Sequence, residues 1–138
     1  GCGDGVRLYE DRILLEDVVH FEFDSARIRY QSHPLVRNIA RFITEHSDIT
    51  DISIEGHADE VGTDEYNIRL SEARARSMKA LLVSFGVEAS RLRVVGHGKS
   101  QPKIVTLRPE AQNRRVELFV TRKRDAGDIA TSHGRSSR

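Results

Sequence analysis

Apolar and polar positions along the chain change their period several times, and each change indicates a different element. They alternate over residues 18–23, 52–55 and 116–120, which predicts three strands with one buried face each. Residues 92–95 add a further short strand. The alternation in the first of these segments rests on Val19, Phe21 and Phe23.

Two stretches of helical period separate these strands. Residues 32–46 begin with Ser32 as the expected N-cap, and their apolar side chains recur on one stripe: Leu35, Ile39, Phe42 and Ile43. Residues 64–85 form the longer helix. Gly86 then supplies the left-handed residue that commonly ends a helix.

The order of elements, β-α-β-α-β-β, predicts an α+β fold. Two crossovers place successive strands parallel, whereas the last strand follows a loop without a helix and can pair antiparallel. We therefore expect a two-layer sandwich, a mixed sheet with two main helices packed on it. Residues 1–11 are expected to be a lead-in or linker remnant, residues 12–121 the domain, and residues 122–138 a disordered basic tail.

The composition excludes several classes of function. Of the 138 residues, 38% are hydrophobic and 31% charged, and the net charge is only +1. The positive excess lies in residues 122–138, so the body lacks the basic surface of a nucleic-acid binder. No apolar run reaches the roughly 18 residues of a transmembrane helix.

The single cysteine, Cys2, excludes an internal disulfide. It follows Gly1 at the start of the sequence, and three interpretations stay open. Cys2 is the remnant of a lipoprotein attachment site, part of a segment that was cut, or a leftover without a role.

The segment of residues 56–75 contains the most informative polar pattern. A strand ends, a turn presents Asp59, and the following helix carries five residues on one continuous face: Asn67, Leu70, Ser71, Arg74 and Met78. Asp59 and Arg74 can therefore flank one small site, with opposite charges at the mouth of a pocket. A carboxylate and a guanidinium suit a zwitterionic ligand. The alternative is a direct ion pair between them, which contributes little.

Four pieces of the chain together resemble the OmpA C-terminal-like family of peptidoglycan-binding domains. They occur in the family's order and span about 100 residues from Phe21 to Val120. The pieces are Phe21-Glu22-Phe23-Asp24-Ser25-Ala26, then Ile54-Glu55-Gly56-His57-Ala58-Asp59 with Gly62, then Asn67, Leu70-Ser71 and Arg74-Ala75, and finally Asn113-Arg114-Arg115-Val116-Glu117.

The resemblance implies a clamp for the peptide stem of the cell wall. By motif position, Asp59 and Arg74 would hold the amino and carboxylate groups of meso-diaminopimelate. The remaining residues that the resemblance places at the site are Asn67, Leu70, Asp24, Ser25, Ala26 and Arg115. One departure is visible, because Ala58 stands where the family usually has Thr, and this puts the fine geometry and the affinity in doubt.

The resemblance also implies a function and a location. We expect a non-enzymatic domain without cofactor that anchors an outer-membrane or envelope protein to peptidoglycan, at the periplasmic face of the Gram-negative outer membrane. Any contact with the membrane would come through an upstream region. A periplasmic interaction or stator-type scaffold module is the alternative, and a homodimer through the apolar second helix stays open.

Two chemical alternatives have little support in the sequence. His57 and Asp59 are close enough in sequence to share a metal ion, but nothing nearby completes a ligand set, so no metal site is expected. A peptidoglycan hydrolase would need a carboxylate pair or an activated nucleophile, and the local spacing suggests neither.

Overall fold

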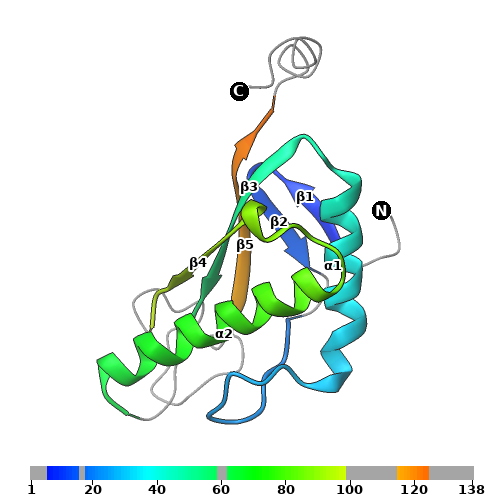
Figure 1. Ribbon diagram of the computed structural model, residues 1–138. Coiled ribbons are helices and arrows are strands. Elements are labelled where there is room, and N and C mark those ends of the chain that lie inside the picture. Colours follow the sequence, from blue (N-terminus) through cyan, green and yellow to red (C-terminus); the bar gives the residue numbers. More distant parts are fainter. Residues whose placement is uncertain (1–5, 16–17, 59–61, 99–114, 125–138) are drawn as a thin grey trace.

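A five-stranded mixed sheet carries two helices on one face (Figure 1). The computed structural model describes residues 6–15, 18–58, 62–98 and 115–124. The strands lie in the order β1-β2-β5-β3-β4. Their bounds are β1 Val6–Tyr9, β2 Arg12–Leu15, β3 Ile49–Gly56, β4 Leu92–Gly96 and β5 Val116–Lys123.

The predicted fold class is confirmed. Strands β3 and β4 are parallel neighbours joined through a helix, as a crossover requires. The last strand, β5, runs antiparallel to both β2 and β3 and lies between them. The sheet is therefore mixed, and its two helices make it a two-layer α+β structure.

The strand predicted over residues 18–23 is wrong. This segment makes only an isolated bridge, Phe21 to Ile28, because the chain reverses at Asp24, whose φ is +54°. Local bonds close the reversal, with the N–H of Glu22 donating to the carbonyl of Arg27 at 2.9 Å. A polar reversal satisfies the backbone groups that a strand would have paired.

The sheet instead begins with the hairpin of β1 and β2, which the apolar pattern does not predict. Strand β1 lies within residues 1–11, where only a lead-in was expected, and it contributes the buried Val6 to the core. At the other end, β5 extends to Lys123, two residues into the expected tail. Residues 125–138 lie outside the described residues.

The helices are α1, His33–Glu45, and α2, Asp64–Ser84, with short 3₁₀ turns η1, Tyr30–Ser32, and η2, Ala89–Arg91. Thr63 caps α2, because its hydroxyl accepts from the N–H of Tyr66 at 3.0 Å. Ser32 precedes α1 as predicted, but its hydroxyl accepts from the N–H of His20 at 2.8 Å. Ser32 therefore fastens the preceding loop to the start of α1.

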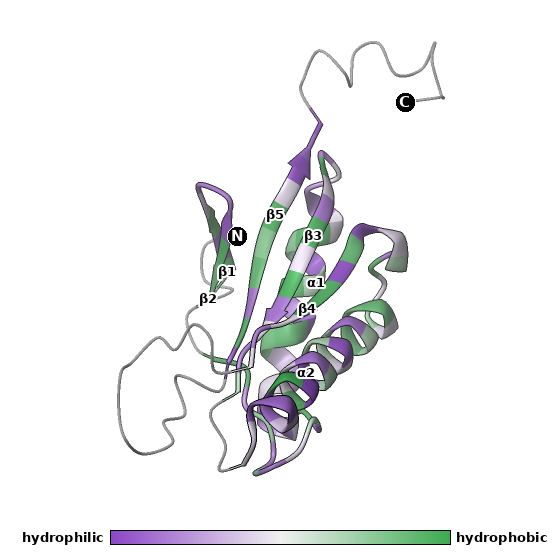
Figure 2. Cartoon of the chain, turned by 90° about the vertical axis from the view of Figure 1, so that its left-hand side faces the viewer, coloured by the Kyte–Doolittle hydropathy of each residue, from purple (hydrophilic) through white to green (hydrophobic). Residues whose placement is uncertain are grey.

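The core lies between the helices and one face of the sheet. Figure 2 shows apolar residues concentrated along β3 and β5. Residues with 0% exposure include Ile39 and Ile43 of α1, Ile52 and Ile54 of β3, and Leu118 of β5. These residues remove their side chains from water, which is the main contribution to stability.

Two glycines allow α2 to lie directly on the sheet. A Cβ on Gly56 would come within 2.1 Å of the carbonyl oxygen of Ser71. On Gly96 it would come within 2.7 Å of the backbone nitrogen of Glu72. Gly56 and Gly96 are paired across β3 and β4, so no side chain separates α2 from the sheet at this level.

Gly56→Ala should therefore destabilise the domain by about 3 kcal/mol or more, because backbone blocks the added methyl group. Urea unfolding followed by circular dichroism measures this change. Gly86→Ala is the control: its Cβ would meet nothing within 4 Å, and only the positive φ of +109° is penalised, by about 1–2 kcal/mol. A loss for Gly56→Ala no larger than for Gly86→Ala would contradict the close approach.

Candidate functional site

Three backbone segments meet just before Asp59. The N–H of His57 donates to the carbonyl of Arg115 at 2.7 Å, and the N–H of Ala58 donates to the carbonyl of Gly98 at 3.0 Å. The N–H of Gly98 donates in turn to the hydroxyl of Ser71 on α2 at 2.8 Å. The end of β3, the turn after β4 and the start of β5 are thus joined to α2 at the end of the sheet where β3 and β4 terminate.

Ala58 replaces the family's usual Thr at a buried position. It is 1% exposed, and its backbone already bonds to Gly98. A hydroxyl here would need a hydrogen-bond partner inside the protein. The Ala therefore fits its buried surroundings.

The loop of Asp24, Ser25 and Ala26 is attached to α2 at two points. The Tyr66 hydroxyl donates to Oδ1 of Asp24, and Nε of Arg74 donates to the carbonyl oxygen of Ser25 at 2.8 Å. Within the loop, the hydroxyl of Ser25 accepts from the N–H of Arg27 at 2.9 Å. The structure thus brings the predicted loop residues next to Arg74.

Arg74 is buried, with an exposed fraction of 1%. Its guanidinium carbon lies 5.2 Å from the centre of the Phe21 ring, a cation–π contact, and Nε is held by the Ser25 carbonyl. The expectation that Arg74 stands at the mouth of a pocket is therefore wrong for this structure. The loop that turns at Asp24 covers the side chain, and the alternating pattern of residues 18–23 gave no sign of that turn.

The predicted face of α2 is confirmed as one continuous surface, and it points into the protein. Asn67 and Ser71 are 0% exposed, and Leu70 is 8% exposed. Nδ2 of Asn67 donates to the carbonyl of Thr63 at 3.0 Å, one turn earlier in the chain. Asn67 and Leu70 therefore share the buried face of α2 on which Arg74 lies.

Asp59 lies outside the described residues, as do residues 60 and 61. The structure places the residue before it, Ala58, at the edge where β3, β5 and α2 meet. Its pairing with Arg74 therefore stays a prediction.

Arg115 contributes its side chain to an ion-pair cluster. Nε of Arg115 lies 3.0 Å from Oε2 of Glu117, Nε2 of His57 lies 3.2 Å from Oε1, and Nη1 of Arg12 lies 3.6 Å from Oε2. The Glu117 carboxylate is thus contacted by three side chains that come from different segments of the chain. The carbonyl of Arg115 also accepts from the N–H of His57, the residue before Ala58.

This cluster sets the ionisation of Glu117. Burial alone would raise the pKa of the Glu117 carboxyl, but the neighbouring His57 and the guanidiniums of Arg115 and Arg12 outweigh burial and lower its pKa to about 2. Glu117 is therefore an anion throughout the ordinary pH range.

A second pair continues this polar surface across β3 and β4. The rings of His57 and His97 stack with centroids 4.9 Å apart, and Nε2 of His97 lies 2.7 Å from Oε1 of Glu55. The sequence analysis missed Glu55, Glu117 and His97. Polar residues alternate with the buried Ile54 and Leu118 along the two strands, which indicates that they lie on the other face of the sheet. This alternation does not indicate which polar residues contact each other across strands.

Comparison with known proteins decides the family. The model of the OmpA family matches residues 20–115 of the chain. The chain belongs to the OmpA family. This match covers all of α1, β3, α2 and β4.

Several curated relatives of this OmpA-family chain are named as outer membrane or peptidoglycan-associated proteins. Outer membrane porin F of Pseudomonas aeruginosa is 41% identical over 105 residues, which are 74% of this chain and 30% of the porin. The peptidoglycan-associated lipoprotein of Mesorhizobium japonicum is 38% identical over 106 residues, 75% of this chain and 62% of the relative. The chain thus spans less than two thirds of these relatives.

Solved structures have the same fold. The peptidoglycan-associated lipoprotein from Burkholderia pseudomallei superposes with a TM-score of 0.69 and 33% identity, covering 76% of this chain and 91% of that one. A periplasmic domain of Helicobacter pylori MotB gives a TM-score of 0.68 at 20% identity, covering 94% and 87%. The likeness to MotB therefore concerns the fold alone.

The described residues of this OmpA-family domain contain neither a helix that could span a membrane nor a cluster of metal ligands. Neither α1 nor α2 combines the length and apolar composition that crossing a bilayer requires. Over the same residues, no three His, Cys, Asp or Glu side chains are grouped so that they could bind a metal ion.

Glu117→Gln should flatten the dependence of stability on pH between about 4.5 and 2. The folded-state pKa of about 2 lies below the ordinary 4.5, so the carboxylate stabilises the fold above pH 4.5, and this contribution is lost as the pH falls toward 2. At pH 7 the variant should lose at most about 3 kcal/mol. Denaturant unfolding across this pH range measures both effects.

The matched control is Glu72→Gln, because Glu72 pairs with Arg76 on the exposed side of α2 at 3.1 Å. It should change stability by at most about 0.5 kcal/mol. Glu117→Gln following the wild-type pH profile would show that the cluster does not hold the carboxylate in its ionised form.

Proposed function

We propose that this domain binds peptidoglycan non-covalently through the meso-diaminopimelate of the stem peptide, with Asp59 and Arg74 as the charged pair. The observation that carries the proposal is Arg74, a guanidinium whose Nε is held by the carbonyl of Ser25 in the loop of Asp24 and Ser25. Family membership and the relatives named peptidoglycan-associated lipoprotein support it.

The zwitterion of diaminopimelate fits this pair chemically. Its ammonium group matches the carboxylate of Asp59, and its carboxylate matches the planar guanidinium of Arg74. Each charge-assisted bond contributes roughly 1.5–3 kcal/mol. Two or three such bonds, less the cost of immobilising the ligand, correspond to roughly millimolar to micromolar affinity.

Burial of Arg74 adds a requirement to the proposal. At 1% exposure, the guanidinium meets a ligand carboxylate only after the loop at Ser25 moves away from it. Asn67 and Leu70, on the same face of α2 as Arg74, line the proposed site. The loop of Asp24, Ser25 and Ala26 must therefore change its conformation when the ligand binds.

Weak binding to single stem peptides is enough for a function in the cell, because many such contacts act together. A polymeric wall carries many stem peptides, so many copies of an envelope protein hold it by avidity. We propose that the domain anchors an outer-membrane or envelope protein to the wall from the periplasmic side, without catalysis. The names of the relatives, an outer membrane porin and a peptidoglycan-associated lipoprotein, support this placement.

Asp59→Ala and Arg74→Lys should each abolish co-sedimentation with purified wall sacculi. The first removes the carboxylate, and the second keeps the charge but loses the planar fork that meets a carboxylate with two bonds. Asp64→Ala and Arg76→Ala are the matched controls, since both residues are exposed on α2 outside the proposed site. Circular dichroism of each variant verifies the fold.

Walls that contain Lys in place of diaminopimelate provide a sharper comparison. Lys has the ammonium group but lacks the second carboxylate, so binding by the wild-type domain should fall by at least about tenfold. Equal sedimentation with both walls would remove Arg74 from its proposed role. Release of soluble muropeptides during the same incubation would indicate a hydrolase and overturn the non-catalytic proposal.

A further inference from the structure

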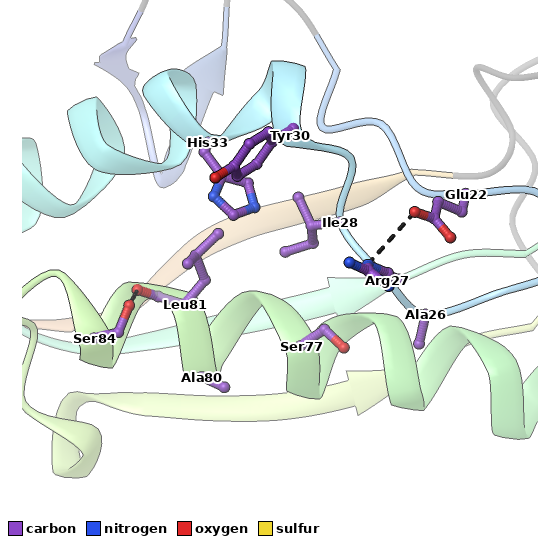
Figure 3. A pocket seen from close by; sticks show the side chains of 10 residues that line it. All are labelled: Glu22, Ala26, Arg27, Ile28, Tyr30, His33, Ser77, Ala80, Leu81 and Ser84. Carbon is purple, nitrogen blue, oxygen red and sulfur yellow. Dashed lines mark hydrogen bonds and ion pairs between the residues drawn. The ribbon is translucent and has the colours of Figure 1, made fainter.

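A cavity of about 710 Å³ lies between the loop after Phe21 and the side of α2 (Figure 3). Its volume falls within the range of small-molecule sites. The lining residues are Glu22, Ala26, Arg27, Ile28, Tyr30, His33, Ser77, Ala80, Leu81 and Ser84. None of them belongs to the charged pair proposed above, and only Ala26 belongs to its loop.

The charged residues of this cavity neutralise each other. Nε of Arg27 lies 3.5 Å from Oε2 of Glu22, and both side chains reach solvent. An arginine already paired with a carboxylate offers donors and acceptors without net charge. This end of the cavity therefore favours a neutral, hydrogen-bonding ligand over an ionic one.

The opposite end has an aromatic wall. Tyr30 is 87% exposed and contacts the ring of His33 edge to face, with centroids 5.2 Å apart, above Leu81 (Figure 3). The phenol combines an apolar ring face with a hydroxyl group. The hydroxyl of Ser77 and the apolar Ile28 complete the lining between the two ends. A sugar carries neutral hydroxyl groups beside the apolar faces of its ring, so its chemistry matches this lining.

The cavity adjoins the proposed diaminopimelate site. Ala26 lines it, and the preceding residue, Ser25, accepts the bond from Arg74. Along α2, Ser77 and Ser84 follow Arg74 by three and ten residues, which is about 4.5 to 15 Å of helix. In peptidoglycan two amino acids separate diaminopimelate from the sugar, and with their linkages they span about 10 Å when extended. A stem held at Arg74 therefore has the length to bring its sugar to this cavity.

We infer that this cavity binds the N-acetylated amino sugars of the same peptidoglycan strand whose stem peptide occupies the site at Arg74. This inference rests on the proposed function and extends it from the peptide to the glycan. The domain then recognises a stem together with its point of attachment, and it distinguishes a wall fragment from free peptide.

Calorimetry with two ligands tests the inference: a diaminopimelate-containing tripeptide, and the same tripeptide carrying its N-acetylglucosamine–N-acetylmuramic acid disaccharide. The wild-type domain should bind the sugar-bearing ligand about three- to tenfold more tightly, the range that one aromatic contact supplies. Tyr30→Ala should lose this difference and bind the free tripeptide as the wild type does. Ser77→Phe, which places a bulky side chain in the cavity, should do the same.

Tyr9→Ala is the matched control, because Tyr9 is a 62% exposed tyrosine on β1 that does not line the cavity. It should bind both ligands as the wild type does. Equal wild-type affinity for the two ligands would overturn the glycan inference and leave the peptide site intact. Binding of neither ligand would overturn the proposed function and this inference together.

Discussion

The direct contact of α2 with β3 and β4 is the constraint on which the rest of the structure depends. Gly56 and Gly96 lie side by side on the two strands, and a methyl group on either would collide with the backbone of α2. Helix and sheet therefore meet backbone to backbone at the level where the strands end. Interiors pack densely, so this contact fixes the height and direction of the helix.

The placement of α2 in turn decides where the polar residues of its buried face lie. Ser71 accepts the N–H of the turn at Gly98, and Arg74 donates to the carbonyl of Ser25. The helix thus holds both the turn at Gly98 and the loop at Ser25. A buried guanidinium is stable only among groups that compensate its charge, so Arg74 organises its surroundings as well as offering a ligand contact.

The opposite face of the sheet has a different organisation, in which charges pair across strands. Glu117 of β5 contacts three side chains: Arg12 of β2, His57 just after β3, and Arg115 just before β5. The stacked rings of His57 and His97 link this group to Glu55. These contacts link β2, β5 and the end of β3 on the face of the sheet that no helix of the described residues covers. They also hold the end of β3, where the candidate site begins.

Local pattern determined much of this protein. Periodicity and caps indicated both helices nearly to the residue, the strands β3, β4 and β5, and the mixed α+β sheet, because each signal is contained within one element. The same holds for the face of α2 from Asn67 to Met78. The family resemblance, rather than any spacing, implied that Arg74 and the loop of Asp24 to Ala26 belong to one site.

Only the tertiary structure decided the rest, because it depends on contacts between distant segments. The positive φ of Asp24 turns residues 18–23 into a cover over Arg74, and the hairpin of β1 and β2 takes the place of the predicted strand. Which polar residue pairs with Glu117 depends on the register between β5 and its neighbours. The cavity beside α2 likewise requires a loop and a helix that lie about 50 residues apart in sequence. Alternation and spacing describe one segment at a time, whereas burial, pairing and cavities are set by how the segments meet.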